Sequence, residues 1–124
     1  MAKVLGLGGF FFKAEDPKAV RDWYARVLGF EVHDWGGAVF EAPKDSQATW
    51  SPFAADTDYF APSAAPFMIN FIVDDIDGVL ARAAAEGVEP LGRQDEGYGR
   101  FAWLMDPAGV KIELWEPAKA EPGA

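Results

Sequence analysis

Hydrophobic and polar positions follow two patterns along the chain, and their order predicts the order of elements. An apolar, β-rich run over residues 4–14 is typical of a buried strand. Asp16 and Pro17 then suit the cap and the first position of a helix, and apolar residues recur at helical spacing until Gly29 closes it. Short strands are expected next, over residues 30–35, 38–42 and 47–53.

The second half of the chain repeats this order of elements. A strand is expected over residues 67–73, and a helix follows that is capped by Asp75 and ends at Gly87. Three more strands are expected, over residues 88–91, 100–105 and 110–115. Residues 12–20 (FKAEDPKAV) align without a gap on residues 71–79 (FIVDDIDGV), with Phe, Asp and Val matched. We interpret this match as an internal repeat of a βαβββ unit.

The repeat predicts an α+β fold in which two βαβββ modules pair their curved sheets around a cup. One module alone would leave half of its sheet uncovered, whereas two modules bury each other's open faces. A length of 124 residues fits one domain. We expect a single domain over residues 1–116, with modules at 4–54 and 67–116, a linker at 55–66 and a flexible tail at 117–124. An α+β sandwich without internal symmetry is the alternative.

Composition and charge exclude several classes of function. The formal net charge of −9 would repel a phosphate backbone, so we expect no nucleic-acid partner. The absence of cysteine excludes disulfides, thiolate metal sites and a cysteine nucleophile. Lys13 interrupts the N-terminal apolar run, and no apolar segment reaches the roughly 18 residues of a membrane span. We therefore expect a cytoplasmic protein with no membrane partner.

Four segments carry a resemblance to a known family. They are residues 11–16 (FFKAED), 23–30 (WYARVLGF), 72–77 (IVDDID) and 106–115 (DPAGVKIELW). The chain resembles the vicinal oxygen chelate superfamily, also called the glyoxalase/bleomycin-resistance/dioxygenase superfamily, over roughly residues 5–116. The resemblance implies paired βαβββ modules and, by analogy with short members, a homodimer. Its members include metal-dependent isomerases, ring-cleaving dioxygenases, thiol transferases and metal-free drug-binding proteins.

The resemblance also locates the positions where metal-using members hold a divalent ion. They correspond here to Gly9, Trp50 or an immediate neighbour, Met68 and Glu113. Hard divalent cations need nitrogen or oxygen ligands, so Glu113 is the only one of the four that matches the family. We therefore predict neither a bound metal nor another cofactor, which argues against glyoxalase and dioxygenase activity.

Strand alternation indicates which side chains face the cup. The predicted lining consists of Phe11, Trp50, Met68, Asn70, Ile72, Glu113 and Trp115. An apolar lining with a few polar groups is what a small-molecule site requires, although the same aromatic side chains would also fill a packed core. The only histidine, His33, fits a polar surface position as well as a general base, and the facing of Glu41 is open. We assign no catalytic residue.

Three hypotheses follow. The first is a metal-free protein that binds a small aromatic or cationic molecule in the cup. The second is a metal-dependent lyase, isomerase or dioxygenase whose ligands are displaced or shared between subunits. The third is a non-catalytic structural dimer with a filled interior. Metal analysis separates the first two, and the volume of the cup separates the first from the third.

Overall fold

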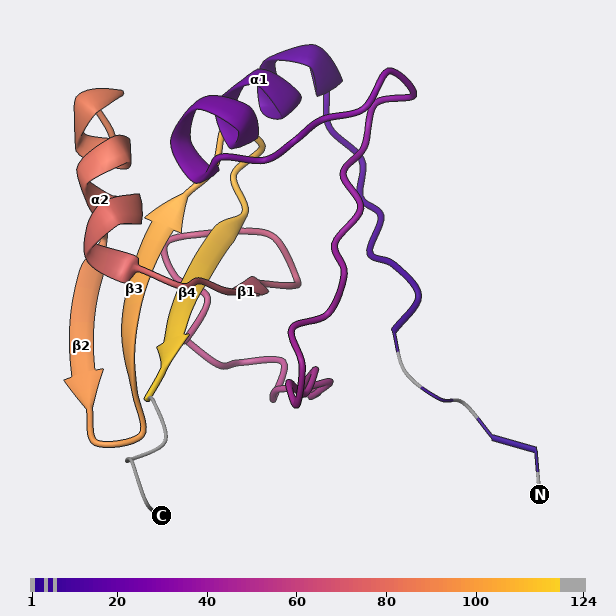
Figure 1. The fold of residues 1–124 in the computed structure, drawn as a ribbon, viewed down its shortest axis with the longest axis vertical. Coiled ribbons are helices and arrows are strands. Elements are labelled where there is room, and N and C mark those ends of the chain that lie inside the picture. The colour runs from indigo at the N-terminus through magenta and orange to yellow at the C-terminus, as the bar shows by residue number, and fades with distance from the viewer. Residues whose placement is uncertain (1, 4, 6, 119–124) are drawn as a thin grey trace.

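A four-stranded sheet with two helices forms the ordered centre of the chain (Figure 1). The computed structural model describes residues 2, 3, 5 and 7–118. In chain order the elements are α1 (Pro17–Leu28), β1 (Ile69–Ile72), α2 (Ile76–Ala85), β2 (Gly92–Glu96), β3 (Gly99–Met105) and β4 (Lys111–Pro117). The strand order is β1-β4-β3-β2, with β1 parallel to β4 and the other pairs antiparallel. Neither helix is long and apolar enough to cross a membrane.

Both helices begin at the positions that the repeat predicts. The Asp16 carboxylate accepts a hydrogen bond from the Ala19 N–H at 3.1 Å, and the Asp75 carboxylate accepts the equivalent bond from the Gly78 N–H at 3.1 Å. Helix α1 ends at Gly29, which adopts the left-handed conformation with φ of 74°. The internal repeat therefore marks equivalent helix caps in the two halves.

The hydrophobic core lies between the helices and one face of the sheet. Alternate residues of the two central strands point to this face and are fully buried, namely Ala102 and Leu104 of β3 and Ile112 and Leu114 of β4. The helices contribute Val20, Trp23, Tyr24, Val27, Ile76 and Ala83. Because alternation puts the intervening side chains on the other face, the strands present a second set of residues away from the core.

A buried hydrogen-bond network ties the turn between β3 and β4 to helix α1. The Tyr24 hydroxyl donates to Asp106 Oδ2 at 2.5 Å, and Asp106 Oδ1 accepts the backbone N–H groups of Ala108 and Val110, both at 2.8 Å. Burial, and then the neighbouring Asp106 carboxylate, raises the pKa of Tyr24. The phenol therefore stays protonated and acts as a donor, which fixes the turn against the helix.

The second half of the chain confirms the predicted βαβββ order, and the whole confirms the α+β class. One strand is displaced: the sequence predicts a strand over residues 88–91, but β2 begins at Gly92. The end of helix α2 explains the shift, because the Val88 N–H donates to the Ala83 carbonyl at 2.8 Å. Val88 is thus bound to the last helical turn and is not available to the sheet.

The first half differs more from the prediction. Over residues 7–66 the structure contains helix α1 and no strand, so the strands expected at 30–35, 38–42 and 47–53 are not formed. Figure 1 shows uncoiled chain leading into and out of α1. Apolar alternation identifies a segment that can form a strand, but a strand also needs a neighbour with which to exchange backbone hydrogen bonds.

The expected first strand gives the same result where it can be assessed. Residues 7–14 contain no strand, whereas positions 4 and 6 of this prediction lie outside the described residues. The predicted tail over residues 117–124 also lies only partly within the described residues. Pro117 belongs to β4 and the Ala118 N–H donates to the Tyr98 carbonyl at 3.3 Å, but residues 119–124 are outside the description.

A candidate ligand site around Glu113

The sheet face opposite the core carries the chemically distinctive residues. Strand pairing places Asn70 of β1 and Trp103 of β3 on either side of Glu113 of β4. The next rung along the sheet holds Ile72, Trp115 and Phe101 in the same arrangement. These six positions alternate with the buried core positions, so their side chains share the open face. Two polar side chains thus lie among four apolar ones.

Three donors hold the Glu113 carboxylate. Asn70 Nδ2 donates to Oε1 at 2.7 Å, and Trp103 Nε1 donates to Oε2 at 2.8 Å. The third donor is the hydroxyl of Tyr59, which comes from the loop between the two halves and also reaches Oε2. Glu113 is only 8% exposed, so these bonds replace the water that a carboxylate loses on burial. Both oxygens of Glu113 are therefore engaged by neutral groups.

Lys111 places a positive charge beside this cluster. Its Nζ donates to the Tyr59 carbonyl at 2.6 Å and lies 5.3 Å from the centre of the Tyr59 ring and 5.8 Å from that of Trp103. Burial, then the hydrogen bond and charge of Glu113, raises the pKa of Tyr59 to about 12. At neutral pH Tyr59 is therefore an uncharged hydrogen-bond donor between a cation and a carboxylate.

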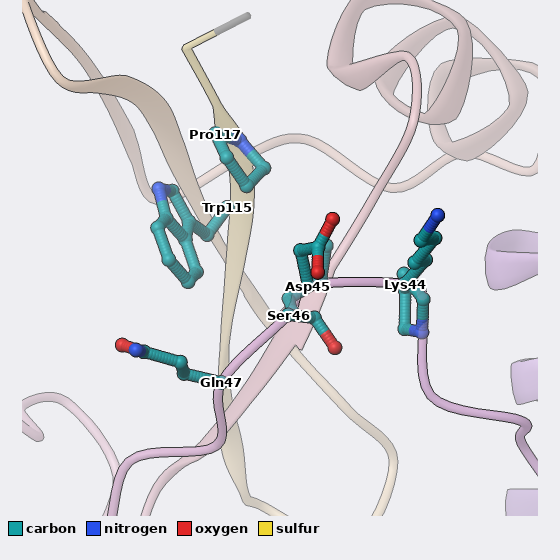
Figure 2. Close-up of a pocket in the computed structure, with 8 residues that line it drawn as sticks. Lys44, Asp45, Ser46, Gln47, Trp115 and Pro117 are labelled. Atoms are coloured by element: carbon teal, nitrogen blue, oxygen red, sulfur yellow. The ribbon is translucent and has the colours of Figure 1, made fainter. Parts of the chain in front are cut away.

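A hollow of about 290 Å³ adjoins the same face. It is lined by Pro43, Lys44, Asp45, Ser46, Gln47, Ile72, Trp115 and Pro117. Figure 2 shows Trp115 and Gln47 on one side of this space and Lys44 on the other. The Trp115 ring stacks on Phe101 with centroids 6.3 Å apart and planes 4° from parallel. A first-half segment therefore meets the aromatic end of the sheet face and leaves room between them.

The structure brings four of the predicted lining residues together and leaves three apart from them. Asn70, Ile72, Glu113 and Trp115 share the open face. Phe11 and Trp50, which are 89% and 78% exposed, belong to first-half segments that pair with no strand in the described chain, and Met68 is half-buried just before β1. The prediction that Phe11, Trp50 and Met68 line the cup depended on first-half strands and on a cup closed by two sheets. The described part of the first half forms no strand.

The sequence leaves open the roles of two further residues, His33 and Glu41. His33 is exposed and stacks on Trp35, with ring centroids 6.2 Å apart and planes 7° from parallel. It belongs to a tight turn in which its N–H donates to the Gly37 carbonyl at 2.8 Å. Glu41 is exposed as well. Neither residue is among the hydrogen-bond partners of Glu113.

Sequence reasoning missed Trp103 and the contacts of Tyr59 with Glu113 and Lys111. The position of Trp103 had a signal, because a hairpin folded about residues 106–109 brings residue 103 opposite residue 113. The contact of Tyr59 with Glu113 had none, because Tyr59 lies in an irregular loop and the contact spans 54 residues. Only the tertiary structure could reveal it.

The fold is that of the glyoxalase/bleomycin-resistance class of proteins. The Glyoxalase-like domain family matches residues 9–115, so the chain belongs to that family. No curated protein sequence matches the chain significantly.

Solved structures agree with this assignment. TnmS3, an antibiotic binding protein from Streptomyces sp. CB03234, is 25% identical with a TM-score of 0.55, over 85% of this chain and 89% of that one. A glyoxalase/bleomycin resistance protein from the same strain is 24% identical with a TM-score of 0.54, over 83% and 93%. A glyoxylase/bleomycin resistance protein/dioxygenase domain from Frankia sp. EAN1pec is 14% identical with a TM-score of 0.59, over 94% and 100%. The last two show a shared fold.

Proposed function

We propose that this protein binds a small organic molecule on the open sheet face and does so without a metal ion. One observation carries the proposal: Glu113, the residue at a family metal-ligand position, is held by three neutral donors within an aromatic surface. An apolar surface with a few convergent polar groups suits a small-molecule ligand. The neighbouring hollow, which shares Ile72 and Trp115 with this face, supplies space for part of one.

The donor set around Glu113 does not fit a divalent ion. Trp103 offers only an N–H, which cannot bind a cation. The Tyr59 hydroxyl, whose pKa is about 12, would have to lose its proton before it became a strong ligand. Asn70 could add one neutral oxygen, but its amide nitrogen faces Glu113. Within the described part of the chain, no group of three or more His, Cys, Asp or Glu residues is arranged to hold a metal. One carboxylate would leave most coordination positions to water.

The similarity to an antibiotic binding protein supports the same proposal. That relative binds its ligand within the same fold, so a binding role for this chain requires no new architecture. The composition of the open sheet face suits a small aromatic or cationic ligand. Because the chain lacks cysteine, it suits a reducing compartment, and we propose that it works in the cytoplasm.

A metal titration tests the absence of a metal role. We expect zinc, nickel, manganese and iron(II) to show no stoichiometric binding at micromolar concentrations in titration calorimetry, because the ions would compete with three protein donors for one carboxylate. The Glu113→Gln variant should give the same heats as the wild type. Binding of one ion per chain that disappears in this variant would contradict the proposal and restore a metal-dependent enzyme.

We also propose that the protein is a homodimer in which first-half segments pair with the sheet of a second copy. Large apolar side chains are exposed along these segments, namely Leu5, Leu7, Phe11, Trp35, Val39 and Trp50. Such surface is characteristic of an interface. Strand β1 lies at one edge of the sheet, so it has backbone groups available for a further strand. In this arrangement the modules at 4–54 and 67–116 would both be complete.

Sedimentation velocity tests the dimer. We expect a species of twice the chain mass, and we expect the Leu5→Glu variant to weaken the association by roughly tenfold or more because it places a charge in an apolar contact. Leu5 is 91% exposed in the single chain, so the substitution should leave the chain fold intact. A monomer at every concentration would show that the first half does not need a partner.

A further inference from the structure

Tyr59 occupies the Glu113 site in the way that a ligand would. Its hydroxyl donates to Glu113 Oε2, while its ring lies against Phe53 with centroids 5.6 Å apart and planes 27° from parallel. The ring is nearly perpendicular to that of Trp103, with centroids 6.5 Å apart and planes at 87°. The site therefore already holds an aromatic ring with one donor, packed against two other aromatic side chains.

The way Tyr59 is held allows it to leave. It lies in an irregular loop and is 38% exposed, although its hydroxyl reaches a nearly buried carboxylate. Its other hydrogen bonds are two of its backbone, from Lys111 Nζ to its carbonyl and from its N–H to Thr57 Oγ1 at 3.2 Å. These backbone bonds can persist while the side chain turns out, and loops of this kind are readily rearranged.

The charged groups around the Tyr59 ring determine which ligands can take its place. Glu113 loses one donor when Tyr59 leaves, and a ligand that supplies a donor restores this bond. The Lys111 ammonium lies close to both the Tyr59 and Trp103 rings, so it attracts the face of a neutral, electron-rich ring and repels a cation. Glu113 and Lys111 together bring no net charge to the site. These features favour an aromatic over a cationic ligand.

We propose that the Tyr59 side chain occupies the ligand position when no ligand is bound. The ligands of the site are neutral aromatic molecules that carry a hydroxyl or amino donor and displace Tyr59 from Glu113. This inference rests on the proposed binding function and makes its ligand class specific. Tyr59 competes with the ligand, so removal of its side chain increases the fraction of binding-competent protein and strengthens binding.

Calorimetric titration with two matched probes tests the proposal. The probes are 2-naphthol, which carries a donor, and 2-methoxynaphthalene, which has the same ring system and no donor. In Tyr59→Ala we expect 2-naphthol to bind about tenfold tighter than it binds the wild type, and about tenfold tighter than the ether binds the same variant, because only the naphthol can donate to Glu113. Tyr59→Phe keeps the ring and should show a smaller gain. Circular dichroism should confirm that both variants are folded.

The outcomes separate this inference from the proposed function. Equal binding of the two probes to Tyr59→Ala, or equal affinity of 2-naphthol for this variant and the wild type, would overturn the role of Tyr59 and leave small-molecule binding in place. Failure of both probes to bind any form of the protein would overturn the aromatic ligand class assigned here and leave a cationic ligand for the proposed function. A preference for 2-naphthol that disappears when Glu113→Leu is added to Tyr59→Ala would support the contact that we assign, because leucine offers no acceptor.

Discussion

Asp106→Ala is expected to lower the free energy of unfolding by about 3 kcal/mol, because the substitution removes one acceptor group shared by three donors. Asp106 is 4% exposed, and it accepts the Tyr24 hydroxyl and the N–H groups of Ala108 and Val110. Once the carboxylate is gone, the Tyr24 hydroxyl and the turn have no equivalent acceptor in this network. Urea denaturation followed by circular dichroism measures the effect.

Tyr24→Phe is the matched control for this prediction. It removes a single hydroxyl and leaves the two backbone bonds of the turn, so we expect a loss of about 1–2 kcal/mol. Which of the two variants loses more free energy of unfolding matters more than the size of either loss. A loss for Asp106→Ala no greater than that for Tyr24→Phe would mean that the backbone bonds of the turn do not depend on Asp106.

Leu114→Ala is expected to lower the free energy of unfolding by about 2–5 kcal/mol, the range for a large side chain removed from a packed core. Leu114 is fully buried between the sheet and the helices. Neighbours on β3 and α2 cannot move far enough to fill the space, because each is tied to its own element. Thermal or urea unfolding at equal protein concentration measures the loss.

Ile72→Ala provides the control on the opposite face of the sheet. Ile72 is 38% exposed and lines the hollow beside Trp115, so its truncation should cost less than about 1 kcal/mol. We expect it instead to weaken binding of an aromatic probe. If Ile72→Ala were as destabilising as Leu114→Ala, the open face would be a packed core, and the structural-dimer hypothesis would replace the binding one.

Glu113 is the one family metal-ligand position that this chain retains. The resemblance implies that metal-using members use a Glu here as an ion ligand, whereas this chain surrounds Glu113 with Asn70, Trp103 and Tyr59. A carboxylate held by neutral donors can exchange one of them for a donor on a ligand without passing through a charged, uncovered state. In the proposed function the same position serves recognition, and Tyr59 is the group that we propose a ligand displaces.

The sequence by itself determined the family, the α+β class and the order of the elements in the second half. The reason is that these depend on local signals. Asp16 and Asp75 cap their helices with their own side chains, Gly29 supplies a left-handed residue, and alternation along β4 separates Glu113 from Leu114. The shared face of Asn70, Ile72, Glu113 and Trp115 follows from the same alternation once the strands are paired.

The tertiary structure alone decided that the first-half segments around α1 form no strands, and which residues contact Glu113. The segments at 30–35, 38–42 and 47–53 have the apolar character of strands, but strand formation depends on a neighbour that local sequence does not encode. Tyr59 reaches Glu113 across 54 residues from an irregular loop, where no periodicity fixes the direction of a side chain. Local patterns specify which face a residue occupies within its element, whereas the approach of distant segments is settled by packing and by the need to satisfy a buried carboxylate.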